Sequence, residues 1–416
     1  MRHSVVGAFA LIATLHGTSA LAQAVDAPKP PVAPVATGAG GWSFNPDSGW
    51  VYRAWDFKLT TWGFAERLFD PDGPDAFRRF RQGAEFDFPR ITDRLRPALV
   101  YEVDLTNTGF FDNDFGGSQG VGPRNLENLF LSLQDVDDPG RFRVLVGENT
   151  HILSRDDNLS SGNLPTINRS LILEEHGSVN SFGAQFGVQF QTAVATGITL
   201  QLAAMDNRGS FNAADPRYQI GNSLSGKLLL TPIHDPDRGR RLTLGLAVDR
   251  TGDIRDRAFT LATAIAQTPL GAVPATGNKT TWEADAAWTF RVFDRPATLE
   301  AEAMRSRFSE SRSDVVGGYA MAQWSLFDAP AVGDLDVFVR YDVVSLGQDG
   351  ITDRAEQRAV RTGLNYNLPR TGKLLSLHVE QAHNTISGPA AIVTGDREGD
   401  EFRIGLRASF QRYNRH

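Results

Sequence analysis

Residues 402–410 read FRIGLRASF, and this stretch decides the fold of the chain. Every even-numbered position in it is apolar, whereas the odd-numbered positions include Arg403 and Arg407. Successive side chains of a β-strand point to opposite faces, so the stretch would have one apolar face and one charged face. An α-helix would spread the same apolar residues around its circumference. The pattern therefore predicts a strand with two chemically different faces.

Runs with the same period of two recur along the chain, separated by Gly, Pro, Asp and Asn. In one of them, Trp282 and Trp288 lie on one face while Glu283 and Asp285 lie on the other. Each run has roughly the ten residues that a strand needs to cross a bilayer. Counting these runs predicts sixteen strands, at 52–65, 77–88, 95–107, 124–135, 141–148, 181–194, 197–206, 219–231, 240–250, 279–292, 296–307, 313–327, 333–345, 355–368, 372–385 and 397–411.

The connections between the predicted strands alternate between short and long, apart from one short joint near 308–312. Short turns on one rim and long loops on the other are typical of bacterial outer-membrane barrels, whose turns face the periplasm. Because lipid offers no hydrogen-bond partner, the strand edges must close on one another. We therefore predict an all-β fold, a sixteen-stranded antiparallel transmembrane β-barrel with short periplasmic turns and long extracellular loops. A soluble propeller or sandwich also alternates in this way, but the chain has no blade-length repeat.

The first residues have the three parts of a secretory signal peptide. A positively charged start (1–3) precedes an apolar run (5–15) and a small-residue stretch (20–24). The apolar run is shorter than the roughly 20 residues that a membrane-spanning helix needs. We predict a signal peptide at 1–24, a proline- and alanine-rich tether at 25–41 and an outer-membrane barrel at 42–416, in the outer membrane of a Gram-negative bacterium.

The composition excludes several kinds of site. The 416 residues include no cysteine, which excludes disulfides, thiolate metal sites and a cysteine nucleophile. The formal net charge of −7 and the pI near 5.7 do not indicate nucleic acid as a partner. The motifs of the chain indicate neither a metal nor a cofactor, and we expect neither.

The charged faces of the predicted strands identify the side that meets water. An arginine facing lipid near the bilayer midplane would cost about 2–4 kcal/mol, whereas in a water-filled lumen it stays hydrated. We expect most of these residues to be solvating groups or ion pairs, and aromatic residues near strand ends, Trp62 among them, to form outer girdles. The predicted lumen-facing residues are Arg81, Glu85, Asp87, Glu102, Asp104, Arg143, Arg241, Glu283, Asp285, Arg291, Glu300, Glu302, Arg340, Asp342, Arg361, Arg403 and Arg407.

Two stretches share a recognisable order of elements. Residues 78–105, RRFRQGAEFDFPRITDRLRPALVYEVDL, give an Arg-led strand, a short turn and a strand with an acidic inner face. Residues 141–190 begin with a strand ending in Val-Gly before a long third loop, which contains Ser160-Ser161 and Arg169-Ser170-Leu171. In this order and in these SS and RSL elements the chain resembles the phosphate-selective porin O and P family of outer-membrane porins.

The resemblance implies a trimeric, sixteen-stranded channel whose third loop folds inward as the constriction. In this chain that loop is 149–180, and the candidate constriction residues are Arg155, Asp156, Asp157 and Arg169, with the two arginines as anion contacts. Whether Arg169 meets solute or only ties the loop to acidic wall residues stays open. The family's phosphate preference is associated with a lysine-rich pore, whereas the candidate barrel lysines here are Lys58, Lys227, Lys279 and Lys373.

We predict an outer-membrane porin, a passive diffusion channel for small solutes, including anions such as phosphate, and not an enzyme. Its partners would be these solutes, outer-membrane lipid and lipopolysaccharide, and further copies of the chain in a homotrimer. The alternative is an outer-membrane barrel hydrolase with an active site at the rim. That alternative would draw on His151, His176, His378, His383, Ser154 and Glu175, although the chain has no H-E-x-x-H motif.

Overall fold

The structure is a computed structural model, and it describes most of the chain after residue 39. The described residues are 40–45, 49–69, 76–105, 126–138, 140–155, 164–167, 169–173, 184–206, 221–255, 258–261, 271–329, 332–369, 371, 374–393 and 397–410. They belong to one compact unit, 39–416. The predicted signal peptide (1–24) and the predicted tether (25–41), apart from its last two residues, lie outside the described residues.

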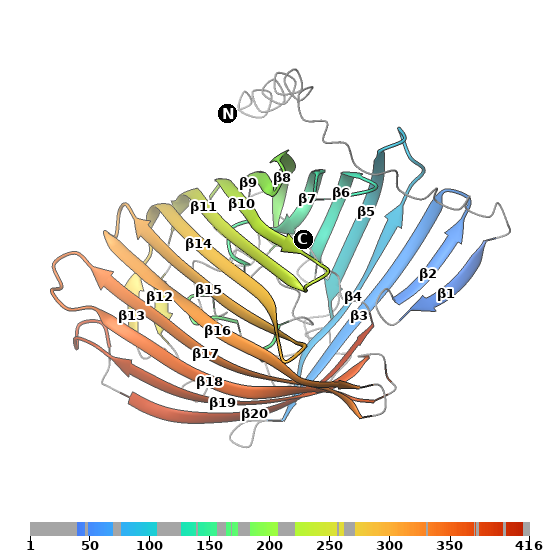
Figure 1. The fold of residues 1–416 in the computed structure, drawn as a ribbon. Coiled ribbons are helices and arrows are strands. Elements are labelled where there is room, and N and C mark those ends of the chain that lie inside the picture. The colour runs from blue at the N-terminus through green and yellow to red at the C-terminus, as the bar shows by residue number, and fades with distance from the viewer. Residues whose placement is uncertain are drawn as a thin grey trace, which may run out of the picture. The chain divides into compact units, whose positions relative to one another are not determined.

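Sixteen antiparallel strands form one closed ring (Figure 1). Each strand pairs with its neighbour along the chain, β11 pairs with β14, and β20 closes the ring on β3 from Gly63–Phe410 to Phe69–Ile404. The predicted sixteen-stranded antiparallel barrel is confirmed. Its strands are β3 (Phe57–Phe69), β4 (Ala76–Asp87), β5 (Leu95–Asp104), β6 (Leu126–Asp135), β7 (Phe142–Thr150), β8 (Ala184–Ala195), β9 (Ile198–Asp206), β10 (Ser223–Asp235), β11 (Arg240–Ile254), β14 (Gly277–Val292), β15 (Arg295–Phe308), β16 (Ser313–Ala329), β17 (Gly333–Gln348), β18 (Ala355–Asn367), β19 (Leu375–Ser387) and β20 (Arg397–Phe410).

The first predicted strand, 52–65, is wrong in one respect. It spans two strands, because a turn at Trp55, whose φ is 51°, separates β2 (Gly49–Ala54) from β3. β2 pairs with β1 (Gly41–Asn45) on one side and with the first residues of β3 on the other. The β1–β2 hairpin therefore lies along the part of β3 that β20 does not reach.

The two faces of the barrel wall have opposite chemistry. Trp282 is 62% exposed and Leu246 is 57% exposed on the outer face, whereas Arg340 and Lys279, on the inner face, are at most 1% exposed. This arrangement is the reverse of a water-soluble protein and suits a wall with lipid outside and polar groups inside. Among the described residues, no helix is long and apolar enough to cross a membrane.

Trp62 corrects the predicted outer girdle. It is 4% exposed and packs on the inner face with Val100, Phe130 and Leu145. Gly83 lies opposite Trp62 in the neighbouring strand, and a Cβ at that position would lie 2.4 Å from the indole ring. The glycine therefore leaves the space that the inward-pointing ring fills.

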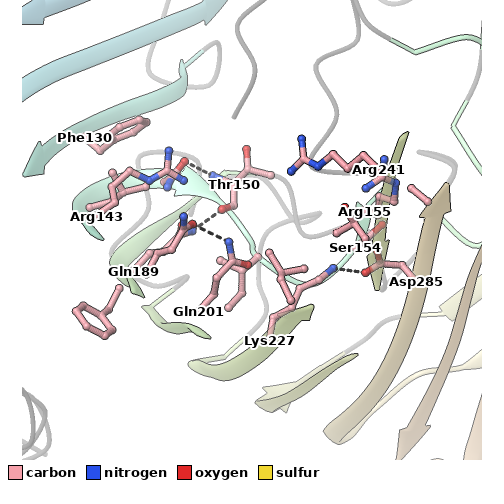
Figure 2. A pocket seen from close by; sticks show the side chains of 18 of the residues that line it. Phe130, Arg143, Thr150, Ser154, Arg155, Gln189, Gln201, Lys227, Arg241 and Asp285 are labelled. Carbon is pink, nitrogen blue, oxygen red and sulfur yellow. Dashed lines mark hydrogen bonds and ion pairs between the residues drawn. The ribbon is translucent and has the colours of Figure 1, made fainter. Parts of the chain in front are cut away.

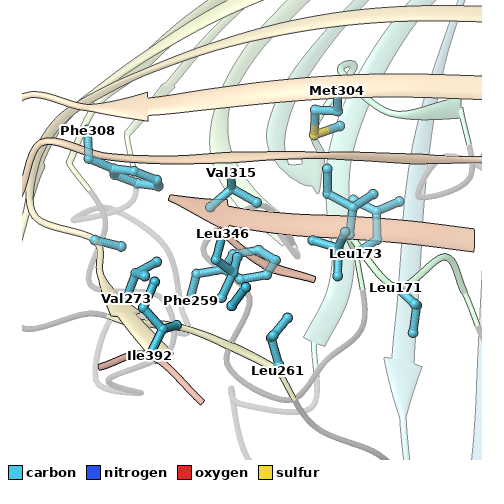
Figure 3. Packing of buried hydrophobic residues seen from close by; sticks show 14 of the residues in the cluster. Leu171, Leu173, Phe259, Leu261, Val273, Met304, Phe308, Val315, Leu346 and Ile392 are labelled. Carbon is cyan, nitrogen blue, oxygen red and sulfur yellow. The ribbon is translucent and has the colours of Figure 1, made fainter. Parts of the chain in front are cut away.

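The long connection after β11 folds into the interior instead of forming an outer loop. It carries a hairpin of β12 (Ala258–Leu261) and β13 (Gly271–Pro274), whose Phe259 and Val273 pack against Val315 and Leu346 of the wall (Figure 3). We call the whole set the inner apolar cluster. Its members are Leu153, Leu171, Ile172, Leu173, Ala247, Ile254, Phe259, Leu261, Val273, Ala275, Met304, Phe308, Val315, Val344, Leu346, Ala355, Ala359, Ile386, Ile392 and Val393.

The inner apolar cluster lies toward the rim of the long loops. Phe308 ends β15 and Leu346 is near the end of β17, while Val315 is near the start of β16, so all three lie near the rim opposite the short turns. The cluster takes in Leu171–Leu173 of the third loop. The third loop and the β12–β13 hairpin thus pack together inside the barrel and fill part of its interior.

Candidate functional site

The third loop is fixed inside the barrel from its first residues. His151, which is 1% exposed, follows the end of β7, and its Nε2 lies 2.7 Å from the hydroxyl of Ser225 and 3.3 Å from the carboxylate of Asp249. The Ser225 hydroxyl donates to the same carboxylate at 2.8 Å. These buried polar contacts tie the start of the loop to β10 and β11.

The Ser225–His151–Asp249 group bears on the hydrolase alternative. The backbone N–H of Leu153 donates to Nδ1 of His151 at 3.2 Å, so the ring proton is on Nε2, the nitrogen that faces Ser225. A general base must present an unprotonated nitrogen to its nucleophile, while an acid holds the other ring N–H. In this group Nε2, the nitrogen that faces Ser225, carries the proton, and Asp249 lies beside the same nitrogen instead of the other one. The group is therefore an anchor for the loop and does not activate Ser225.

Three further contacts hold residues 151–155, which we call the outgoing part of the loop. Lys227 donates to the carbonyl of Leu153 at 2.8 Å, and Ser154 donates its hydroxyl proton to Glu302 at 2.7 Å. Arg155 donates to Glu300 at 3.0 Å. Burial disfavours the charge on Arg155, but the neighbouring Glu300 carboxylate outweighs that effect and raises the pKa of the guanidinium. Arg155 is therefore a cation in an ion pair.

Arg407 of the last strand holds the returning part of the loop, whose described residues are 164–167 and 169–173. Its Nη1 donates to the carbonyl of Leu164 at 2.8 Å and its Nη2 to the carbonyl of Thr166 at 3.3 Å. The same guanidinium donates through Nε to Glu66 of β3 at 2.7 Å. Arg407 is 2% exposed and Glu66 is 1% exposed, so one buried ion pair spans the β20–β3 seam and grips the loop backbone.

Other wall side chains satisfy the loop backbone in the same way. Asn365 donates to the carbonyl of Pro165 at 2.8 Å, and Glu380 accepts the backbone N–H of Ile167 at 2.8 Å. Buried backbone groups must find partners, and here the barrel wall supplies them because this segment forms no helix or strand of its own. Wall side chains therefore hold the main chain of this segment, and the role of Arg169 stays a prediction.

The predicted lumen-facing residues occupy inner-face positions, and many form ion pairs. Arg81 pairs with Asp104 at 3.0 Å and with Glu127 at 3.1 Å, and Arg340 pairs with Asp342 at 3.0 Å. The inner-face positions are held by Arg81, Glu85, Asp87, Glu102, Asp104, Arg143, Arg241, Glu283, Asp285, Arg291, Glu300, Glu302, Arg340, Asp342, Arg361, Arg403 and Arg407.

A cavity of about 220 Å³ lies between the outgoing part of the third loop and the wall from β6 to β14. Its charged lining residues are Arg143, Arg155, Lys227 and Arg241 against the single acid Asp285. Arg143 and Arg241 stand near the starts of their strands, on the side of the short turns, and extend into the cavity from opposite sides in Figure 2. The cavity is thus positively charged, and the inner apolar cluster lies toward the opposite rim.

The structure brings together only part of the predicted constriction. Arg155 lines the cavity. Arg169 is half-buried beside Ser170 and Leu171, in the segment that leads into the inner apolar cluster. Asp156 and Asp157 lie outside the described residues, as do His176 and Glu175 of the hydrolase alternative.

The neutral polar lining of the cavity was not predicted from the sequence. Gln189 and Gln191 of β8 and Gln201 of β9 form it, and Gln201 donates to the side-chain carbonyl of Gln191 at 2.7 Å. All three glutamines lie at odd-numbered positions, and Gln191 pairs with Arg143 across β7 and β8. This shared parity was the sequence signal that could have placed them on the inner face. Among the described residues, no group of three or more His, Cys, Asp or Glu side chains could hold a metal ion.

The fold is similar to those of solved outer-membrane proteins at low sequence identity. An anion-selective porin from Comamonas acidovorans is 15% identical, with a TM-score of 0.53 over 85% of this chain and 100% of that chain. OmpF of Salmonella typhi, solved with daunomycin, is 12% identical, with a TM-score of 0.54 over 89% of this chain and 100% of that one. A loop L8 deletion mutant of OmpT, an outer membrane protein of Vibrio cholerae, is 11% identical, with a TM-score of 0.55 over 85% and 99%.

The chain has the fold of the outer-membrane porins. No family model and no curated protein sequence matches it. A closed barrel with an apolar outer face and a charged inner face is stable only with lipid around it, so the chain is an outer-membrane protein.

Proposed function

We propose that the protein is a porin, a passive diffusion channel for small solutes in the outer membrane of a Gram-negative bacterium, with a preference for anions. One observation carries this proposal. The third loop is held inside the barrel by wall side chains and leaves beside it a cavity whose charged lining is four cations and one acid. A charged lining of one sign between low-dielectric walls raises the local concentration of the opposite ion.

The proposal places the constriction at the third loop. Arg155 is the member of the predicted constriction set that borders the cavity; on the wall, Arg241 lies on the same side of the cavity as Arg155 and Arg143 on the other (Figure 2). Arg241 is solvent-exposed, and no described carboxylate lies within ion-pair distance of it. An uncompensated cation beside the third loop favours anions over cations.

We also propose that the protein is not an enzyme. The one buried Ser–His–Asp group among the described residues carries its histidine proton on the nitrogen that faces the serine. A G-x-S-x-G pattern occurs at 116–120, outside the described residues, in a glycine-rich connection between two strands. In a nucleophile elbow this pattern occupies a strand-to-helix turn, whereas the described residues on either side of 116–120 belong to strands of the barrel wall.

The finer assignments are also proposals. The resemblance to the phosphate-selective porin O and P family suggests phosphate as one permeant anion, a homotrimer as the assembly, and lipid and lipopolysaccharide as surroundings. The charged cavity lining contains one lysine, Lys227, beside three arginines, so an arginine-based anion path takes the place of a lysine-rich one.

The test is the conductance of the purified protein in planar bilayers. We expect open channels in steps of three, a reversal potential under a KCl gradient that reports anion preference, and a reduced chloride current when phosphate is added. Channels that prefer cations would overturn the anion preference, and channels without phosphate block would remove phosphate as a substrate. The absence of conductance from correctly folded barrels would overturn the porin function itself.

A further inference from the structure

The cavity beside the third loop combines charge with apolar surface. Its lining includes the buried side chains of Phe130 and Leu145, which are 4% and 5% exposed. These two residues continue into a cluster with Trp62 and Val100 on the inner face of the wall. In a passage for small hydrated ions, apolar surface of this kind contributes nothing, because such ions gain no free energy by contacting it.

The positive charge of the cavity is unevenly compensated. Lys227 is paired with Asp285 at 2.7 Å and with Glu283 at 3.2 Å, and Arg155 is paired with Glu300. Arg241 differs, because none of the described carboxylates lies within ion-pair distance of it. A planar guanidinium with free donors binds a carboxylate through two parallel hydrogen bonds.

Neutral amides fill the wall between the two arginines. Gln189 donates to the carbonyl of Thr150, and Gln191 donates to the carbonyl of Gly140 at 3.1 Å. Because these side chains are tied to the backbone, they offer polar surface without a competing negative charge. An acidic residue at any of these positions would pair with Arg241 or Arg143 and exclude an anionic ligand.

The size of the cavity is compatible with a small ligand. Its volume of about 220 Å³ has room for a small organic acid. The described lining offers Arg241 at one end and, at the other, the apolar surface of Phe130 with Arg143 beside it (Figure 2).

We propose that this cavity is a binding site for small organic anions, which place their carboxylate against Arg241 and their apolar body against Phe130 and Leu145. The inference rests on the proposed function, since it names the solute class that a channel would select at this point. Inorganic phosphate has the charge but no apolar body, so it would gain only the arginine contact.

Binding is measured by isothermal titration of the refolded full-length barrel in detergent with sodium benzoate, sodium phosphate and benzamide. Benzamide has the same ring as benzoate but no charge. We expect benzoate to bind, and phosphate and benzamide to bind about tenfold more weakly or not at all. Phosphate binding as tight as benzoate binding would overturn the proposal, as would equal binding of benzamide.

Two variants and a control locate the site. Arg241→Gln should weaken benzoate binding about tenfold, and Phe130→Leu should weaken benzoate more than phosphate. Arg238→Gln removes the same charge from the exposed turn that precedes β11 and should leave both affinities unchanged. If Arg241→Gln binds benzoate like the parent barrel, the site is not this cavity.

The outcomes separate this inference from the proposed function. Barrels that conduct ions but bind no benzoate would remove the organic-anion site and leave the porin intact. Barrels that bind benzoate in the expected order but carry no current would remove the porin and leave the site. A heat-modifiable band on gel electrophoresis confirms for each variant that the barrel has folded.

Discussion

The inner apolar cluster and the cavity are two regions that the same loop builds in different ways. In the cluster, Leu171–Leu173 of the third loop meet Phe259 and Leu346, and every member is at most 6% exposed. At the cavity, the loop contributes Arg155 to a lining that stays accessible and carries net positive charge. The difference shows that the loop fills the interior toward the long-loop rim and leaves space toward the short-turn rim.

The arginines of the interior also fall into two groups, one buried and paired and the other exposed in the cavity. Arg407 and Arg340 are buried and hold the returning part of the loop through its carbonyl and hydroxyl oxygens, with Glu66 and Asp342 as their ion-pair partners. Arg241 is exposed in the cavity. Identical side chains on the same face of the wall therefore have two roles, which variants can separate.

The largest effect is expected from Arg407→Ala. The substitution leaves Glu66 buried without its cation and removes two donors from the loop backbone, and breaking a buried pair in this way costs about 3–5 kcal/mol. The free energy of unfolding of the detergent-refolded barrel in guanidinium measures it. Arg358→Ala serves as the control, because Arg358 pairs with Glu356 at an exposed position, and its unfolding curve should not move. Equal effects of the two substitutions would contradict the anchoring role of Arg407.

The next effect is expected from Phe259→Ala within the inner apolar cluster. Phe259 is 1% exposed, and truncating a buried phenylalanine costs about 3 kcal/mol or slightly more. Because β12 packs against the wall from inside, the loss should release the hairpin and raise the single-channel conductance. Phe402→Ala removes the same side chain from the lipid face, where Phe402 is 42% exposed, and should leave the conductance unchanged. Unchanged conductance in both variants would show that the hairpin does not obstruct the passage.

A smaller effect is expected from Gly83→Ala on the wall near the cavity. A Cβ at Gly83 would lie 2.4 Å from the ring of Trp62, so the ring must shift, at a cost of about 1–3 kcal/mol. Trp62 packs with Phe130, so benzoate binding should weaken together with the stability. Gly41→Ala is the matched control, because a Cβ at Gly41 would meet no atom within 4 Å. A parent-like unfolding midpoint for Gly83→Ala would contradict the close packing of Trp62.

The smallest effect in free energy is expected from Arg241→Glu, although it is the most specific for the cavity. Each unit charge contributes roughly 0.5 kcal/mol at about 8 Å in water, so reversing one lumen charge changes the energy of an ion at that distance by roughly 1 kcal/mol, or about fivefold. We expect the anion-over-cation permeability ratio, taken from the reversal potential under a KCl gradient, to fall by at least that factor. Arg238→Glu makes the same charge change in an exposed turn and should shift the ratio less. Equal shifts would mean that net charge, and not the cavity, sets the selectivity.

The strands could be predicted because lipid and water impose a simple alternation on the wall. From Phe402 to Ala408 and from Trp282 to Phe290 each side chain lies on one of two chemically different faces, so its parity alone determines its face. Trp62 escaped this reasoning, because an aromatic residue near a strand end suits an outer girdle as well as an inner packing position. Only the absent side chain of Gly83, on a strand that follows a long loop, makes room for the inward position.

The contents of the barrel could be predicted less well. Val344 and Leu346 lie on the inner face of β17 while Val343 lies on the outer face, so the alternation of apolar and polar residues fails at the long-loop end of this strand. Such a run signals an apolar partner inside, but it does not say which segment supplies that partner. The partner is the β12–β13 hairpin, which the sequence places in an apparently ordinary long connection. Contacts between distant segments decide the interior, whereas local periodicity decides the wall.

The Arg407 contacts also impose an order of events on assembly. Arg407 lies 341 residues after Glu66 and 243 residues after Leu164, and one guanidinium bonds to both. The third loop is synthesised long before the last strand, yet the donors to the carbonyls of Leu164 and Thr166 are on that strand. The loop therefore waits, with its carbonyls unpaired or hydrated, until β20 docks on β3. The contacts of Arg407 with the third loop are thus completed at ring closure, so a barrel that fails to close lacks these two hydrogen bonds.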